Sequence, residues 1–187
     1  MTINLSKGQG ISLAKAAPGL KSAWVGLGWD VSASTSAFDL DTSVFLLGAN
    51  GKLVSDQHFI FYNNLKSPDG AVEHYGDNRT GQGSGDDETI EVNLARVDAA
   101  IEEMIFVVTI HEAVQRSQNF GQVKNAFIRL ADASTEAEVA RYELDEDFST
   151  ETSLEFGRLY RQDGSWQFQA VGKGYTTDLG GFLAKYN

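Results

Sequence analysis

The chain has 187 residues and a formal net charge of -11, with 26 acidic against 15 basic side chains. This balance argues against nucleic acid or an anionic membrane surface as a partner, because both attract basic faces, and it suits a protein that binds cations. The absence of cysteine excludes disulfides, thiolate metal ligands and cysteine nucleophiles. A content of 42% hydrophobic and 11% aromatic residues is typical of a folded globular protein, and we expect a single domain over residues 1–187.

Two features of the sequence bear on location. Residues 1–13 lack the apolar core of a signal peptide, and the longest apolar run, residues 104–108, is far too short to span a bilayer. We therefore expect a soluble, cytoplasmic protein with no direct membrane insertion.

The first clear element is a strand over residues 23–31, after an early short strand that is expected around residues 11–13. Apolar side chains alternate along residues 23–31, and Gly26, Gly28 and Asp30 occupy the opposite face. Because two of these residues are glycines, another group can approach the back of this strand closely. Asp30 stands at its end.

Further apolar runs predict the remaining strands, which cover residues 38–47, 59–62, 90–94, 105–110, 127–130, 139–144, 152–160 and 166–171. Of these, 90–94 resembles an edge strand, 105–110 a central one, and 59–62 a strand buried on both faces. Turns are predicted at Asn50-Gly51, at Asn125 and at Asp163-Gly164.

Two helices are predicted from capping residues. Asp98 could cap a short helix over residues 98–103, and Asp178 a final helix that turns Leu179, Phe182, Leu183 and Tyr186 inward. About eight to ten short strands with little helix indicate an all-β fold, an antiparallel β-sandwich with a few short peripheral helices.

The most unusual stretch is residues 76–88, in which four glycines alternate with acids, amides and hydroxyls. Such a composition predicts a loop. Its adjacent acids Asp86, Asp87 and Glu88 repel one another, and a bound calcium ion would offset that repulsion, because calcium accepts carboxylate, amide and backbone carbonyl oxygens. The loop does not fit an EF-hand, since Arg79 occupies a ligand position. A solvated acidic turn without a metal is the alternative.

Other polar residues stand where predicted strands begin or end. Asp39 and Asp41 lie two residues apart on one strand, with Cα atoms roughly 6.6 Å apart, and Asn63 with Asn64 ends another. If the ends of these strands meet under the acidic loop, so many carboxylates favour two calcium ions over one. The candidate ligands are Asp30, Asp39, Asp41, Asn63, Asp77, Asn78, Gly83, Asp86, Asp87 and Glu88.

Several strings in this sequence resemble the tellurium-resistance TerD family, and they occur in order from Leu5 almost to the carboxyl terminus. The first are Val-Gly-Leu-Gly-Trp-Asp (25–30), Phe-Asp-Leu-Asp (38–41), Phe-Ile-Phe-Tyr-Asn-Asn (59–64), Gly-Asp-Asn-Arg-Thr-Gly (76–81) and Gly-Asp-Asp-Glu (85–88). Later ones are Val-Val-Thr-Ile-His (107–111), Phe-Gly-Gln-Val (120–123), Phe-Ile-Arg-Leu (127–130) and Ala-Val-Gly (170–172). The resemblance implies a β-sandwich that binds two calcium ions and is encoded with bacterial tellurite-resistance and stress-response proteins. It also implies a link to a membrane-associated complex. Family members commonly carry acids where this loop has Gln82 and Ser84.

An enzyme is the competing interpretation. A β-sandwich hydrolase could use two carboxylates near the acidic loop, such as Asp30 and Asp87, as general acid and base. It would need aromatic platforms, for which Trp24, Trp29 and Trp166 are available, but their spacing fits core packing better. A calcium-binding module that acts as a sensor or as a scaffold therefore remains our expectation.

Overall fold

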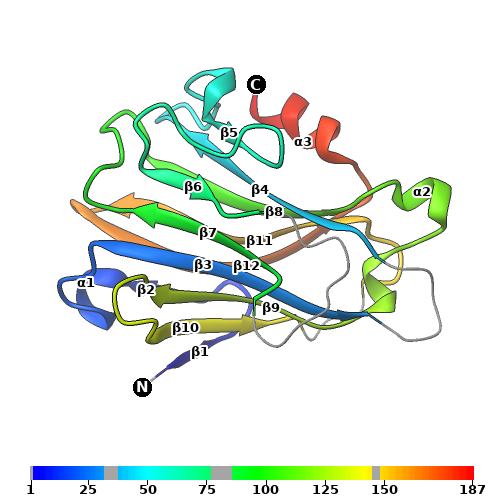
Figure 1. Cartoon of the computed structure of the whole chain (residues 1–187), viewed down its shortest axis with the longest axis horizontal. Coiled ribbons are helices and arrows are strands. Elements are labelled where there is room, and N and C mark those ends of the chain that lie inside the picture. Colours follow the sequence, from blue (N-terminus) through cyan, green and yellow to red (C-terminus); the bar gives the residue numbers. More distant parts are fainter. Residues whose placement is uncertain (1, 32–37, 77–85, 145–147) are drawn as a thin grey trace.

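The fold is a sandwich of two mixed or antiparallel sheets, seen in a computed structural model that describes residues 2–31, 38–76, 86–144 and 148–187 (Figure 1). The first sheet has the order β1 (Ile3–Leu5), β10 (Glu138–Glu143), β9 (Val123–Asp132), β3 (Ser22–Val31), β7 (Glu88–Asn93) and β6 (Val72–His74). The second has the order β2 (Gly10–Ser12), β12 (Ser165–Tyr175), β11 (Ser153–Gln162), β8 (Glu103–Ile110), β4 (Leu40–Leu47) and β5 (Phe59–Ile60). The all-β prediction is confirmed.

The helices are short and peripheral, as expected. They are α1 (Leu13–Ala16), α2 (Ala113–Arg116) and α3 (Leu179–Tyr186), with 3-10 turns at Asp56–His58 and Phe120–Gln122. Neighbouring strands run antiparallel except β1, which lies parallel to β10. Among the described residues, none of the helices has the length and apolar character needed to cross a bilayer.

Most of the predicted strands are present, and the differences have local causes. The early strand ends at Ser12, because Leu13 begins α1. The expected edge strand, β7, lies inside its sheet between β3 and the short β6. The expected strand over 59–62 stops at Ile60, since the chain turns back through a hydrogen bond from Phe61 N–H to the Asn64 carbonyl, and Tyr62 is 44% exposed.

Two local predictions were wrong. No helix forms over residues 98–103. Residues 98–101 make a turn, in which the Asp98 side chain accepts from Ala100 N–H and its carbonyl from Ile101 N–H, and β8 begins at Glu103. Asn125 lies within β9 at a φ of 52°, where the register of β9 against β3 shifts, and so it is not in a turn between strands. The turn at Asp163-Gly164 is confirmed, with both residues at positive φ between β11 and β12.

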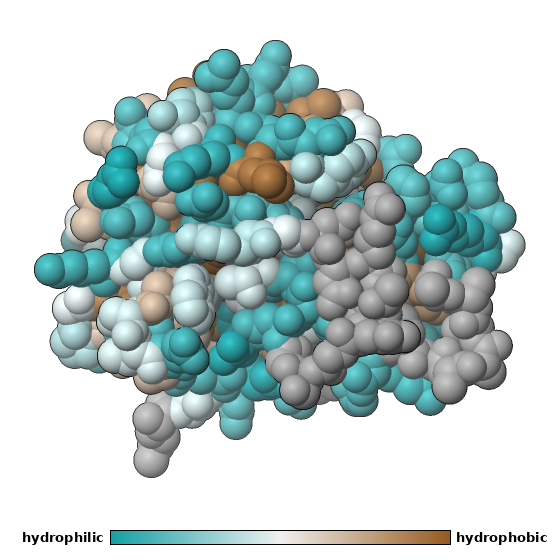
Figure 2. All heavy atoms as spheres, in the orientation of Figure 1, coloured by the Kyte–Doolittle hydropathy of each residue, from teal (hydrophilic) through white to brown (hydrophobic). Residues whose placement is uncertain are grey.

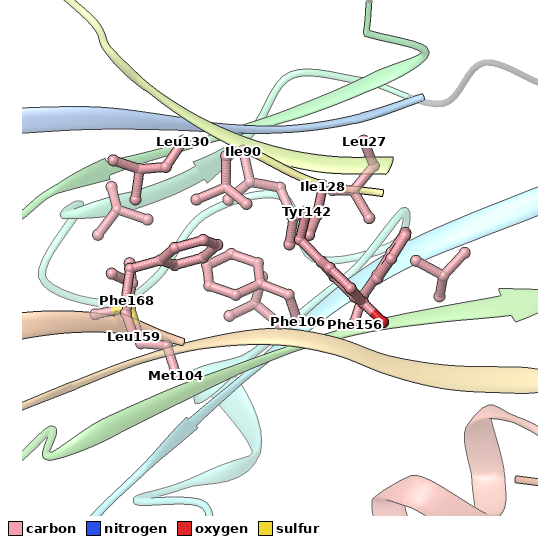
Figure 3. Close-up of a cluster of buried hydrophobic side chains, with 14 of the residues drawn as sticks. Leu27, Ile90, Met104, Phe106, Ile128, Leu130, Tyr142, Phe156, Leu159 and Phe168 are labelled. Atoms are coloured by element: carbon pink, nitrogen blue, oxygen red, sulfur yellow. The ribbon is translucent and has the colours of Figure 1, made fainter. Parts of the chain in front are cut away.

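The core lies between the two sheets, and Figure 3 shows its side chains meeting from both sides. Ile128 and Leu130 come from the first sheet, and Phe106 and Phe168 from the second, and all four are fully buried. A smaller cluster lies on the outer face of the second sheet, under α3, and consists of Phe45, Leu47, Phe59, Ile105, Val107, Phe182 and Tyr186. The face shown in Figure 2, by contrast, is largely hydrophilic.

The second cluster explains the unbroken apolar run of β8. Its residues alternate between the main core, which takes Phe106 and Val108, and the α3 cluster, which takes Ile105 and Val107. Both faces of the strand are therefore buried, and no polar alternation remains in the sequence.

The cap of α3 gives a first prediction. Asp178 Oδ1 accepts from Gly181 N–H at 2.9 Å, so Asp178→Ala should lower the free energy of unfolding by about 1 kcal/mol. Urea denaturation measures the change, and Asp178→Ser, which keeps an acceptor, is the control. Equal losses in the two variants would mean that the cap does not stabilise the helix.

Candidate functional site

The candidate site lies at the edge of the sandwich where β3 ends and β4 begins. Two hydrogen bonds bring these strands and the start of β7 together: Asp87 Oδ2 accepts from Trp29 N–H at 2.8 Å, and Glu88 Oε2 accepts from Thr42 N–H at 2.8 Å. The second bond joins the two sheets. Strand ends that are distant in sequence therefore meet at this edge.

The three consecutive acids where the chain enters β7 lie in three different surroundings. Alternation along a strand separates only successive side chains and would place Asp86 and Glu88 on one face, but β7 begins at Glu88, so Asp86, which precedes the strand, does not follow that pattern. Asp86 lies on the outer face of the first sheet, Asp87 at the end of β3, and Glu88 inside the sandwich.

Asp86 occupies the space that Gly26 leaves on the back of β3. Any Cβ atom at Gly26 would overlap the Asp86 carboxylate. There Arg129, the β9 partner of Gly26 in the sheet, donates from Nε to Oδ1 at 2.6 Å and from its terminal nitrogen to Oδ2 at 2.8 Å. These hydrogen bonds raise the pKa of Arg129. The close approach predicted behind this strand is therefore made by Asp86.

Arg129 is a residue that the sequence analysis missed. A terminal nitrogen of Arg129 also lies 3.6 Å from Glu138 Oε2, and a terminal nitrogen of Arg141 lies 3.7 Å from the same oxygen. Asp86 is therefore part of a series of ion pairs across the outer face. The alternation of β9 places Arg129 on that face, but nothing local in the sequence pairs it with an acid 43 positions earlier.

Glu88 is a buried acid, only 3% exposed, that shares the inner face of β7 with Ile90. His74 Nε2 lies 3.6 Å from its Oε2 and 3.2 Å from the Thr42 carbonyl. The other ring nitrogen, Nδ1, accepts from Gly76 N–H at 3.1 Å, which leaves the proton on Nε2. Burial raises the pKa of Glu88, against the opposing effect of its hydrogen bonds with His74 and Thr42.

Asp87 and Asp30 are two carboxylates close enough to repel each other at this edge. The pKa of Asp87 is raised by burial first, and further by the negative charges of Asp30 and Asp86, against the hydrogen bond from Trp29. A raised folded-state pKa stabilises the fold below the unfolded-state pKa, and this stabilisation is lost as the pH rises through the folded value. Asp30 itself is exposed and accepts from Asn125 Nδ2 at 2.6 Å.

On the second sheet, Asp39 and Asp41 lie at the entry to β4. Within the described residues, Asp39 Oδ1 is buried and has no hydrogen-bond partner, while the Asp39 carbonyl accepts from His111 N–H. Asp41 Oδ2 lies 3.7 Å from His111 Nδ1. A buried carboxylate oxygen without a donor is the kind of group that a hard cation satisfies.

The remaining predicted ligands are less informative. Asn63 is exposed in the turn after β5, and Asn64 donates to the Phe59 carbonyl at 2.7 Å, so the latter amide serves the turn. Asp77, Asn78 and Gly83 lie outside the described residues. Within 2–31, 38–76, 86–144 and 148–187, no three Asp, Glu or His side chains lie close enough together to hold a metal.

These residues nevertheless fit part of a calcium site. Asp30 and Asp87 bring two carboxylates close to each other, Asp39 supplies a buried oxygen without a donor, and the described chain breaks off at Gly76 and resumes at Asp86. Oxygen donors without nitrogen or sulfur ligands suit calcium. Asp86 and Glu88 already have protein partners, in Arg129 and in Thr42 with His74.

The comparison with known proteins gives the family. The TerD domain matches residues 1–186. The chain is 56% identical over 187 residues to a tellurium resistance protein TerD of Alcaligenes sp., covering all of this chain and 97% of that protein. It is 52% identical to general stress protein 16U of Bacillus subtilis, with 100% and 97% covered.

A solved structure agrees with this assignment. A homologue of telluride resistance protein (TerD) from Streptomyces coelicolor A3(2) superposes with a TM-score of 0.72 at 25% identity, covering 88% of this chain and 96% of that one. The match extends along almost the whole sequence and is seen in both sequence and fold. This chain therefore belongs to the TerD family, whose members include proteins named for tellurium resistance and for the general stress response.

Proposed function

We propose that this protein is a calcium-binding module of bacterial tellurium resistance and the general stress response, and that it acts by binding rather than by catalysis. The observation that carries the proposal is the buried Asp39 Oδ1, which has no hydrogen-bond partner among the described residues. Leaving a buried carboxylate oxygen unsatisfied is costly, and a calcium ion would satisfy it.

The charges around Asp87 support the same conclusion. Burial and the nearby carboxylates of Asp30 and Asp86 disfavour its ionised form. A bound cation would reverse that effect, because a nearby positive charge favours the ionised form. Two ions, with ligands shared between the described acids and residues 77–85, remain our proposal.

The hydrolase alternative has little support in the described residues. Trp29 and Trp166 are only 5% and 8% exposed and belong to the core, so they do not line a surface that could hold a sugar. The Asp87 carboxylate accepts a hydrogen bond from Trp29 N–H, so it already has a structural role at the end of β3.

The proposal also covers location and partners. We infer a cytoplasmic protein whose partners are other stress-response proteins, in a complex associated with the membrane, without nucleic acid. The names of its relatives refer to tellurium resistance and general stress, and they support the stress-response part of this proposal.

Calcium removal tests the proposal. Calorimetric titration of chelator-treated protein should give about two calcium ions per chain and a clear preference for calcium over magnesium, which keeps its waters and demands tight octahedral geometry. Calcium at a hundred times its Kd should stabilise the fold by about 2.7 kcal/mol per ion, seen as a higher Tm. No heat of binding together with an unchanged Tm would refute the proposal.

A matched pair of variants locates the site. Asp39→Asn should weaken binding of at least one ion, because an amide lacks the charge of a carboxylate. The control is Asp163→Asn, in the turn between β11 and β12 at the opposite end of the strands, where asparagine tolerates the φ of 50° as well as aspartate does. Calcium affinity that stays the same in Asp39→Asn would remove Asp39 from the site.

A further inference from the structure

A separate concave surface lies beside the candidate site, between α2 and the start of α3. Its volume is about 530 Å³. Its walls come from the start of β4, the end of β8, the segment through α2 and residues 176–180. In Figure 1, α2 projects from the end of the sandwich near the start of α3. The volume is in the range of sites that hold a small molecule or a large side chain.

The charge of this cavity is one-sided. Asp41, Glu112 and Asp178 contribute carboxylates to its wall, and no lysine or arginine is among the described residues that line it. Arg116, whose terminal nitrogen lies 3.3 Å from Glu112 Oε2, is outside this lining. His111, also on the wall, lies 3.7 Å from Asp41 and 3.8 Å from Glu112. A cationic group is therefore the complementary occupant.

The rim of the cavity presents apolar surface. Val114 of α2 is 82% exposed and Tyr62 is 44% exposed, and both line the cavity. Val114 belongs to a short helix that has a non-glycine residue with left-handed backbone at each end. These residues are Glu112, with a φ of 52°, and Ser117, with a φ of 53°. Such conformations are unfavourable for residues other than glycine, and they persist where the surroundings impose them, frequently at functional sites.

We propose that this cavity is a docking site for an arginine side chain of a partner protein. A guanidinium pairs with carboxylates through its fork of donors and also stacks on an aromatic ring, so Glu112, Asp41 and Tyr62 together favour arginine over other side chains. Val114 supplies an apolar contact for the residues that flank the arginine. This inference goes beyond calcium binding and does not require it.

The test is an NMR titration of the isotope-labelled full-length protein with a blocked arginine, N-acetyl-arginine methylamide. Saturable shifts are expected at the backbone amides of Thr109, Thr177 and Gly180, which line the cavity. Blocked citrulline, which has nearly the same shape without the charge, should bind at least about fivefold more weakly. Equal binding of the two probes, or shifts scattered over the acidic surface, would overturn the proposal.

Two variants supply the matched control. Glu112→Gln and Glu143→Gln each remove an exposed carboxylate that pairs with an arginine of its own segment, Arg116 and Arg141, but only Glu112 lines the cavity. The first should weaken arginine binding and leave citrulline binding unchanged, and the second should change neither. An equal loss in both variants would show non-specific attraction to an acidic protein and would contradict a defined site.

The titration is run in chelator and again in calcium, because Asp41 belongs to both this cavity and the predicted calcium ligands. Arginine-specific binding in either condition supports the docking site, and its absence in both overturns it. The calorimetric calcium titration reports on the calcium site independently, so failure of one proposal is distinguishable from failure of the other.

Discussion

Glu88→Ala is expected to lower the free energy of unfolding by about 3 kcal/mol, although the side chain is an acid at the end of an acidic loop. Its carboxylate accepts from Thr42 N–H of the opposite sheet at 2.8 Å, and its Oε2 lies 3.6 Å from Nε2 of His74 on the neighbouring strand β6. Removing it leaves a buried backbone donor unsatisfied, and a donor in that state costs far more than an exposed one. The change is measured by urea denaturation in chelator, so that lost calcium binding is not counted.

The controls separate a buried structural acid from a surface charge. Glu91→Ala, on the same strand but on its outer face with Ser22 and Tyr75 as partners, should cost clearly less. Glu88→Gln, which keeps an acceptor for Thr42 N–H, should fall between the two. If Glu88→Ala were no more destabilising than Glu91→Ala, Glu88 would not join the sheets, and a role limited to metal binding would be favoured.

Gly26→Ala is the second substitution with a large expected effect. The new methyl group would occupy the position of the Asp86 carboxylate and break both hydrogen bonds with Arg129. Hydrogen bonds to charged groups contribute roughly 1.5–3 kcal/mol, so we expect about 2 kcal/mol of destabilisation. Calcium affinity should fall as well, because Asp86 anchors the carboxyl end of the stretch 77–85.

Two comparisons decide whether the effect acts through Asp86. Gly10→Ala, in β2, is the matched control, since its Cβ would meet its nearest neighbours at 3.5 Å or more, an ordinary contact. Asp86→Ala should be about as destabilising as Gly26→Ala, and the double variant should be little worse than either single one. Fully additive losses would show that the methyl group acts elsewhere.

Much of the fold follows from local patterns in the sequence. The alternation over residues 23–31 predicts β3, and Asp178 marks the start of α3, because both depend on periodicity or on a cap a few residues away. The unbroken apolar run over 105–110 predicts a central strand, and β8 indeed lies between β11 and β4 in its sheet. The helix expected at residues 98–103 was wrong, since Asp69 Oδ2, from a distant loop, holds Asp98 N–H at 2.8 Å and fixes a turn there.

The sequence by itself determined that acids stand where strands begin and end, and that the glycines of β3 leave room behind it. Only the tertiary structure decided where each acid goes: Asp86 to Arg129, Glu88 to Thr42 and His74, and Asp87 to the end of β3 beside Asp30. The physical reason is that alternation fixes the face of a side chain only within a strand, which Asp86 precedes, and that it never fixes the neighbours on that face. Those neighbours come from strand order and register, which join residues far apart in the chain.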